Sequence, residues 1–122
     1  MPENSKAPRN ADVPRNLKLY FLCLLRKGPH WDQTQGHDDL MPQQLAFLRR
    51  QTEAGTILLA GPALGHTQNP SDDVTGVTIL RAENLEAAQT IALQDPAVQA
   101  GRLIAELRPV FLPSLDNVRV EY

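Results

Sequence analysis

Apolar and polar residues alternate along the first long apolar stretch of the chain, from Leu17 to Arg26. One set of alternate positions is apolar throughout: Leu17, Leu19, Phe21, Cys23 and Leu25. The other set places three apolar or aromatic side chains between two cations: Lys18, Tyr20, Leu22, Leu24 and Arg26. A period of two indicates a β-strand, and a strand with two apolar faces belongs to a sheet that is covered on both sides.

The spacing of apolar residues becomes helical between Met41 and Ala54. Pro42 occupies a position that the first turn of a helix tolerates, and Gly55 is suited to end the helix. The apolar stripe that we expect to face the core consists of Met41, Leu45, Leu48 and Thr52. This segment is therefore predicted to be the first helix.

Three further strands and a second helix follow in the sequence. The strands are expected at residues 56–60, 74–81 and 103–110. Asn84 is a favourable N-cap for the second helix, and Asp95-Pro96 begins a short further turn that Gly101 ends. The order β-α-β-β-α-β is that of the split βαβ, or ferredoxin-like, arrangement. With right-handed crossovers it predicts an α+β fold, a four-stranded antiparallel sheet with both helices on one face.

A chain of 122 residues has room for one domain. Residues 1–16 contain three prolines and little that could be buried, so we expect a disordered arm there. The domain itself is expected to span residues 17–113, and residues 114–122 are expected to form a tail. One layer of helices covers only one face of the sheet, so the second face predicts a homodimer. A lone domain would leave its side chains exposed: Tyr20, Leu22 and Leu24.

Composition and charge restrict the partners and the compartment. The net charge is −2 and no basic patch stands out, so no nucleic acid partner is expected. No stretch approaches the length that spans a bilayer, and residues 1–16 lack the apolar core of a secretory signal. We therefore expect a cytoplasmic protein without a membrane partner.

Several kinds of chemistry lack support in the sequence. Cys23 is the single cysteine, which excludes an internal disulfide and a cysteine-rich zinc site. His30, His37 and His66 show no short metal-ligand spacing, so a metal site remains open but unsupported. Neither a glycine-rich phosphate loop nor a glycine elbow around Ser114 is present. We expect no metal and no cofactor.

Three segments of the sequence narrow the choice of protein family. Residues 26–31, RKGPHW, close the first strand, and residues 53–62, EAGTILLAGP, join the first helix to the second strand. Residues 95–103, DPAVQAGRL, precede a strand that contains Glu106-Leu107-Arg108-Pro109. Over roughly residues 17–112 the chain resembles the YCII-related family, in the branch with a Gly-Pro-x-Trp turn after the first strand.

The resemblance implies a dimeric α+β barrel with a pocket beside the sheet. It also implies a histidine and an aspartate that work as an acid–base pair. Some members act on aromatic breakdown products, for example by eliminating chloride from a chlorinated hydroxyquinol. The family's histidine lies eleven residues before the glycine that ends the first helix, and counting back from Gly55 gives Gln44. Glutamine forms hydrogen bonds but has no titratable proton near neutrality.

His37 is the best replacement for the missing proton carrier. It lies seven residues before Gln44, near two helical turns, and it is flanked by Asp38 and Asp39, which could fix its tautomer. The competing interpretation is a solvated polar segment ahead of a helix that Pro42 prevents from extending back to His37. Asp95 of the aspartate-proline phrase is the candidate partner or acid, although helix capping also explains it.

Four more residues are candidates for substrate binding. Trp31 either walls a pocket or closes the open end of the sheet. Gly61 and Pro62 follow the second strand at the rim of the sheet, where glycine allows a ligand to approach the backbone and also allows a simple turn. His66 lies in a polar loop that either folds over the pocket or remains at the surface.

Two functions remain open at this point. In the first, the chain is an enzyme of the lyase or isomerase type that acts on a small aromatic or polyketide-like substrate. His37 would be its base, Asp95 the orienting partner or the acid, and Gln44 a hydrogen-bond donor to an oxyanion. In the second, the chain is a binding or accessory domain that kept the pocket and lost the catalytic histidine.

Overall fold

The computed structural model describes residues 14–64 and 74–118. The strands are β1 (Leu17–Lys27), β2 (Ile57–Pro62), β3 (Val74–Leu80) and β4 (Leu103–Pro113). The helices are α1 (His37–Ala54), α2 (Leu85–Ala92) and α3 (Pro96–Gln99). Most of the predicted N-terminal arm and the loop that contains His66 lie outside the described residues.

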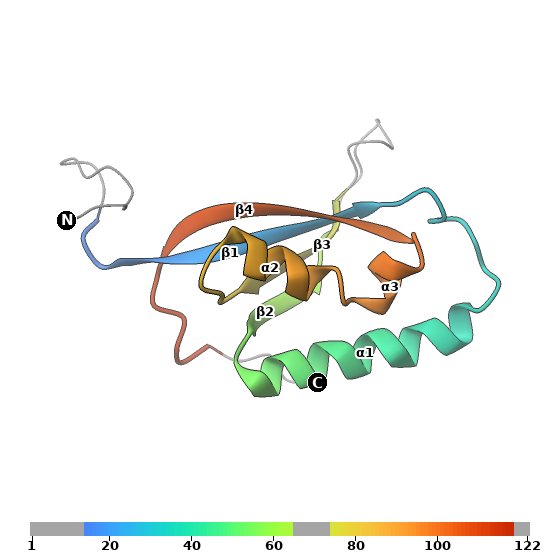
Figure 1. The fold of residues 1–122 in the computed structure, drawn as a ribbon, viewed down its shortest axis with the longest axis horizontal. Helices are drawn as coiled ribbons and strands as arrows, with labels where there is room; N and C mark the ends of the chain where they lie inside the picture. The colour runs from blue at the N-terminus through green and yellow to red at the C-terminus, as the bar shows by residue number, and fades with distance from the viewer. Residues whose placement is uncertain (1–13, 65–73, 119–122) are drawn as a thin grey trace.

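The four strands form one antiparallel sheet in the order β2-β3-β1-β4 (Figure 1). β1 is central and pairs with β4 along its whole length, from Leu17 opposite Pro113 to Lys27 opposite Leu103. This order and the alternation of strands and helices confirm the ferredoxin-like α+β fold that the sequence predicts.

The core lies between the sheet and the helices. Its buried side chains come from β1, α1, β2, β3 and α2: Phe21, Cys23, Phe47, Ile57, Leu80, Ala88 and Ala92. Because α1 and α2 both contribute to this one cluster, they cover the same face of the sheet, the face that carries Phe21 and Cys23 on β1. Figure 1 shows α1 along the lower side of the molecule, with α2 and α3 in front of the sheet.

α1 departs from the prediction at its start and on its inner face. The helix begins at His37 after Gly36, whose φ of 79° is left-handed, so Pro42 lies inside the helix and does not prevent this start. Phe47 is the buried apolar residue of α1, whereas Leu45, expected to face inward, is 39% exposed. The expected stripe is right at Leu48, which packs against the core, and wrong at Leu45. Gln44 and Gln51 lie on the inner face and provide no apolar signal.

The other elements differ at their ends. β2 continues through Gly61 and Pro62, which belong to the strand and not to a turn after it, and β4 continues to Pro113. Tyr20 was expected to be exposed in a lone domain, but it is 2% exposed. Its hydroxyl oxygen accepts a hydrogen bond from the backbone N–H of Leu115 at 3.0 Å. The segment after β4 therefore covers Tyr20 within the same chain.

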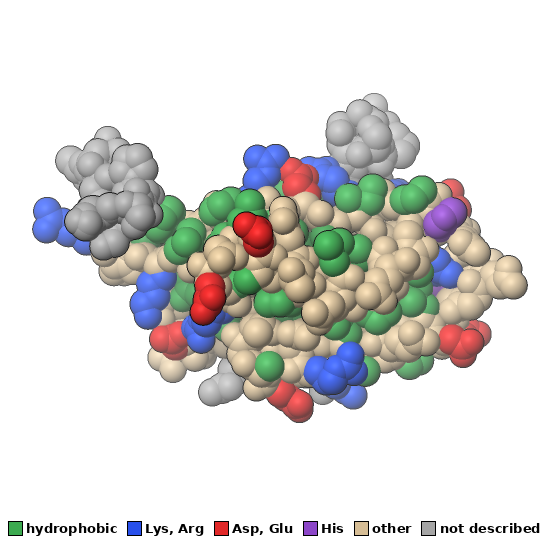
Figure 2. Space-filling model, viewed as in Figure 1, with side chains coloured by type: hydrophobic (Ala, Val, Ile, Leu, Met, Phe, Trp, Pro, Cys, Tyr) green, Lys and Arg blue, Asp and Glu red, His purple; other side chains and the backbone are tan. Residues whose placement is uncertain are grey.

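Charges are mixed on the side of the molecule that Figure 2 shows, where basic and acidic side chains are interspersed without a continuous basic patch. Among residues 14–64 and 74–118, no helix is long and apolar enough to cross a membrane.

Candidate functional site

A large cavity lies between α1, the connection from β1 to α1, and the ends of β2 and β3. Its volume is about 930 Å³. The apolar part of its lining comes mainly from the sheet and from α1, and includes Leu25, Ala60, Met41 and Leu48. A cavity of this size and composition is typical of a site for a small organic molecule.

Gln44 lies at the centre of the inner face of α1. It is half-buried, lines the cavity, and has Phe47 and Leu48 on either side of it within the next turn. Its amide Nε2 donates a hydrogen bond to Oδ2 of Asp95 at 3.3 Å. The Gln44 side chain is therefore held by the Asp95 carboxylate, which lies behind the cavity wall and not in the cavity.

Asp95 is buried, with 4% of its surface exposed. Its Oδ1 accepts the backbone N–H of Ala97 at 2.8 Å, so Asp95 is the N-cap of α3, as its aspartate-proline sequence predicts. Burial raises the pKa of the Asp95 carboxyl, and the hydrogen bonds from Ala97 and Gln44 oppose that rise. Burial, and then the charge of Asp95, raise the pKa of the Cys23 thiol to about 11, so Cys23 is a protonated core residue.

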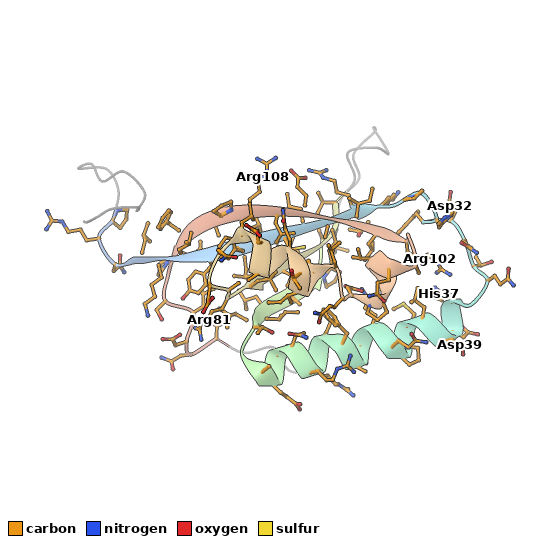
Figure 3. All side chains as sticks on the ribbon, in the orientation of Figure 1. Asp32, His37, Asp39, Arg81, Arg102 and Arg108 are labelled. Atoms are coloured by element: carbon orange, nitrogen blue, oxygen red, sulfur yellow. The ribbon has the colours of Figure 1, made fainter. Side chains whose placement is uncertain are left out.

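His37 is the first residue of α1, and its side chain lines the same cavity as Gln44. Its Nδ1 lies 3.3 Å from Nη1 of Arg102, whose Nη2 donates to the carbonyl oxygen of Gln35 at 2.8 Å. A guanidinium can only donate, so Nδ1 of His37 must be the acceptor, and the ring proton of the neutral imidazole is then on Nε2. Figure 3 shows His37 and Arg102 close together at the N-terminal end of α1.

Arg102 is held in place by its own backbone. Its carbonyl oxygen accepts the N–H of Gly28 at 2.9 Å, and its N–H donates to the carbonyl oxygen of Ala97 at 3.0 Å. The N–H of His30 donates to the carbonyl oxygen of Gly101 at 2.9 Å. The glycine-proline turn after β1 is thus fastened to the start of β4, and this contact fixes the base of the Arg102 side chain.

The predicted site residues are brought together only in part. Trp31, Gly61 and Pro62 line the cavity with His37 and Gln44. Asp95 does not line it and lies behind Gln44, in a second small cavity next to Cys23. The expected pair of His37 with Asp95 is replaced by two pairs, His37 with Arg102 and Gln44 with Asp95. His66 lies outside the described residues.

Three charged residues of the lining were not among the predicted site residues. Arg102 is the most consequential, because its guanidinium reaches a histidine that is 65 positions away in the sequence. Asp32 and Asp38 also line the cavity, and both are exposed. The sequence offered one signal for Arg102, its place after Gly101 in the third family phrase. In the described part of the chain no cluster of three histidine, cysteine or acidic residues could hold a metal ion.

The chain has relatives among known protein families and solved structures. The model of the YCII-related domain matches residues 19–111. No curated protein matches the chain. One similar solved structure is 5-chloro-2-hydroxyhydroquinone dehydrochlorinase from Burkholderia phenoliruptrix AC1100 in complex with 2,5-dihydroxybenzoquinone. It is 26% identical, with a TM-score of 0.49, covering 75% of this chain and 91% of that one. Because the domain model matches most of its length, the chain belongs to the YCII-related family.

Proposed function

We propose that this protein is a small-molecule enzyme that performs an elimination, isomerisation or dehydration by proton transfer. The substrate class is a small aromatic or polyketide-like compound. The observation that carries the proposal is the cavity of about 930 Å³, whose mostly apolar walls also present His37, Gln44 and two carboxylates. A large apolar cavity with a few convergent polar groups is the usual form of an active site.

His37 acts in this proposal as a hydrogen-bond donor through Nε2–H. Arg102 already donates to Nδ1, so a proton added there would break the 3.3 Å contact and place two cations side by side. A neutral imidazole that donates through Nε2 can polarise a carbonyl or phenol oxygen of the substrate without becoming charged. This role differs from that of a base, which the sequence suggested, because the lone pair that a base needs is engaged.

The proton acceptor is then a carboxylate of the cavity lining. Asp38 follows His37 directly in α1, and Asp32 lies in the connection before it; both line the cavity and both are exposed. Gln44 has a second amide N–H beyond the one that it donates to Asp95, and this group can bind an oxyanion. Asp95 serves as a positioning residue, because it touches Gln44 and not the cavity.

The test is proton exchange, which needs no knowledge of the natural substrate. Small enolisable ketones and hydroxylated aromatics are incubated with the protein in D₂O, and loss of carbon-bound protons is followed by NMR. Wild-type protein should accelerate exchange in at least one compound. His37→Ala and Asp38→Asn should each lower that acceleration by about 10²-fold or more, the usual contribution of a positioned acid–base group. Asp39→Asn, in the same helical turn but outside the cavity lining, should leave it unchanged.

A second candidate is a binding domain without catalysis. Gln44 favours it, because this residue stands where the family resemblance places the catalytic histidine and is held by Asp95, the remaining member of the family's pair. Under this alternative, compounds bind in the cavity but no proton exchange exceeds the rate in buffer, and His37→Ala changes only affinity.

A further inference from the structure

Arg102 is a buried cation in the wall of the cavity. Its residue surface is 8% exposed, and it is the only buried lysine or arginine in the described residues. The side chain reaches the cavity from the residue just before β4 and lies against His37 at the N-terminal end of α1 (Figure 3). An arginine so deeply buried ordinarily has a carboxylate partner.

Its charge has no such partner within the described chain. The two side-chain contacts are with neutral acceptors, Nδ1 of His37 at 3.3 Å and the carbonyl oxygen of Gln35 at 2.8 Å. None of the ion pairs formed by residues 14–64 and 74–118 includes Arg102. Asp32 and Asp38 line the same cavity but are exposed and form no ion pair with it.

The guanidinium therefore keeps donors to offer. It has five N–H groups, and the two contacts use two of them, so three remain. A buried cation without a counter-ion is unfavourable in the empty protein, and an anion that enters the cavity would relieve this cost. The planar fork of a guanidinium matches the two oxygens of a carboxylate, which it can bind with parallel hydrogen bonds.

We propose that the cavity takes a small organic acid whose carboxylate is bound by Arg102. This inference rests on the proposed function and names the substrate class of the same site. The carboxylate lies at the Arg102 end, and the apolar body packs against Met41, Leu48 and Leu25. A doubly charged phosphate fits less well, because two acidic side chains line the cavity and the chain has no glycine-rich phosphate loop.

The arrangement also gives His37 a place relative to the substrate. Arg102 contacts His37, and in the proposal it also binds the carboxylate of the substrate. The Nε2–H of His37 can therefore donate to a substrate atom near the acid group. A carbonyl or hydroxyl oxygen on a neighbouring carbon of the substrate would satisfy this geometry. The site is thereby suited to hydroxy- or oxo-substituted acids, in which the acid group anchors and the second oxygen is polarised.

Binding is measured with a matched pair of probes, 2,5-dihydroxybenzoate and its neutral amide, 2,5-dihydroxybenzamide. Trp31 is the only tryptophan of the chain and lines the cavity, so its fluorescence reports occupancy, and calorimetry provides a second reading. Wild-type protein should bind the acid at least tenfold more tightly than the amide. Arg102→Met should remove this preference, and Arg102→Lys should retain part of it because the charge stays. Arg50→Met, on the exposed side of α1, should bind as wild type does.

The proposal is overturned if the wild-type protein binds acid and amide equally, binds neither, or prefers the amide, and these comparisons need no variant to fold. It is also overturned if Arg102→Met keeps the preference. The proton-exchange test is independent: a protein that prefers the acid but exchanges no protons retains the carboxylate site and loses the enzymatic proposal. Proton exchange without any preference for the acid supports the enzyme and removes the carboxylate site.

Discussion

At the scale of single residues, Asp95 combines a favourable position with an unfavourable charge. The carboxylate caps α3 and accepts a hydrogen bond from Gln44, but burial raises its pKa, so the folded protein binds this proton more tightly than the unfolded chain does. The contribution of such a group to stability is fully present below the unfolded pKa and is lost as the pH rises through the folded pKa. Above the unfolded pKa, the burial of the Asp95 carboxyl therefore opposes folding.

The variant Asp95→Asn tests whether the buried Asp95 carboxyl destabilises the fold near neutral pH. Asparagine is an equally good N-cap through Oδ1, and its Nδ2 can donate to Oε1 of Gln44 once the Gln44 amide turns over. It carries no charge to desolvate. The free energy of unfolding of the variant should exceed that of wild type near pH 7, and the difference should shrink towards pH 4. Urea denaturation at several pH values measures it. A variant that is less stable than wild type at pH 7 would show that the ionised carboxylate stabilises the fold.

Gln44→His restores the residue type that the family resemblance places in the first helix. One ring nitrogen would take over the hydrogen bond to Asp95, and the other would face the cavity that Gln44 lines. We expect faster proton exchange in D₂O than with wild type, by about 10²-fold for a compound that already binds. Gln43→His, on the exposed side of α1, is the control. An unchanged rate of proton exchange would mean that a histidine at this position paired with Asp95 is not sufficient for proton transfer.

The residue-scale predictions succeeded where the signal was local. An aspartate before a proline predicts an N-cap, and both Asp95 and Asn84 are N-caps with their side chains on backbone N–H groups. The partnership of His37 with Arg102 could not be predicted in the same way. It depends on two elements that are far apart in the sequence, and no periodicity or spacing encodes which side chains meet across a cavity.

At the scale of elements, alternation located the strands well because each strand carries one face into a common core. The inner face of α1 was harder to find. Gln44 and Gln51 lie near its centre, and polar residues on an inward face cancel the apolar stripe that identifies it. Gln51 is held there through the hydroxyl of Thr56, which donates to its side-chain and main-chain oxygens. The two inward-facing glutamines thus obscured the apolar pattern of α1.

The turn after β1 gives a prediction at this scale. A Cβ at Gly28 would stand against the carbonyl oxygen of Gly101 and only 3.0 Å from the carbonyl carbon of Arg102. These two carbonyl groups lie just before β4, accept hydrogen bonds from the turn after β1 and cannot easily move. Gly28→Ala should therefore reduce the free energy of unfolding by roughly 1–3 kcal/mol. It should also weaken acid binding, because the same contact fixes Arg102.

Gly61→Ala is the matched control for this substitution. Gly61 lies in β2 with ordinary backbone geometry, and a Cβ there would meet nothing within 4 Å. We expect a change within about 0.5 kcal/mol in urea denaturation. If the two variants are equally stable, the close approach of the turn to β4 does not hold Arg102 in place.

At the scale of the whole molecule, helices cover one face of the sheet, and within residues 14–64 and 74–118 no helix covers the other. The register places Leu22 beside Arg108 and Leu24 beside Glu106, so these side chains share the uncovered face. Glu106 accepts from Arg26 at 2.8 Å and from Arg108 at 2.5 Å, and these cations lower the pKa of its carboxyl. The face therefore mixes half-buried leucines with a fixed group of charges.

We propose that this uncovered face joins two copies of the chain. Tyr20 needs no partner, because the segment after β4 covers it, but Ile104 is 49% exposed and lies opposite Arg26 on the same face. Sedimentation at micromolar concentration should give about twice the monomer mass of 13.5 kDa. Ile104→Asp should shift the protein to monomer, because it replaces apolar contact area with a charge that would have to be desolvated in the interface, while the folded chain tolerates it at an exposed position. Leu93→Asp alters a residue of similar exposure, 59%, at the end of α2 on the helical side, and should remain dimeric. A wild-type monomer would contradict the dimer. A dimer that persists in Ile104→Asp but dissociates in Leu93→Asp would show that the interface lies on the helical side.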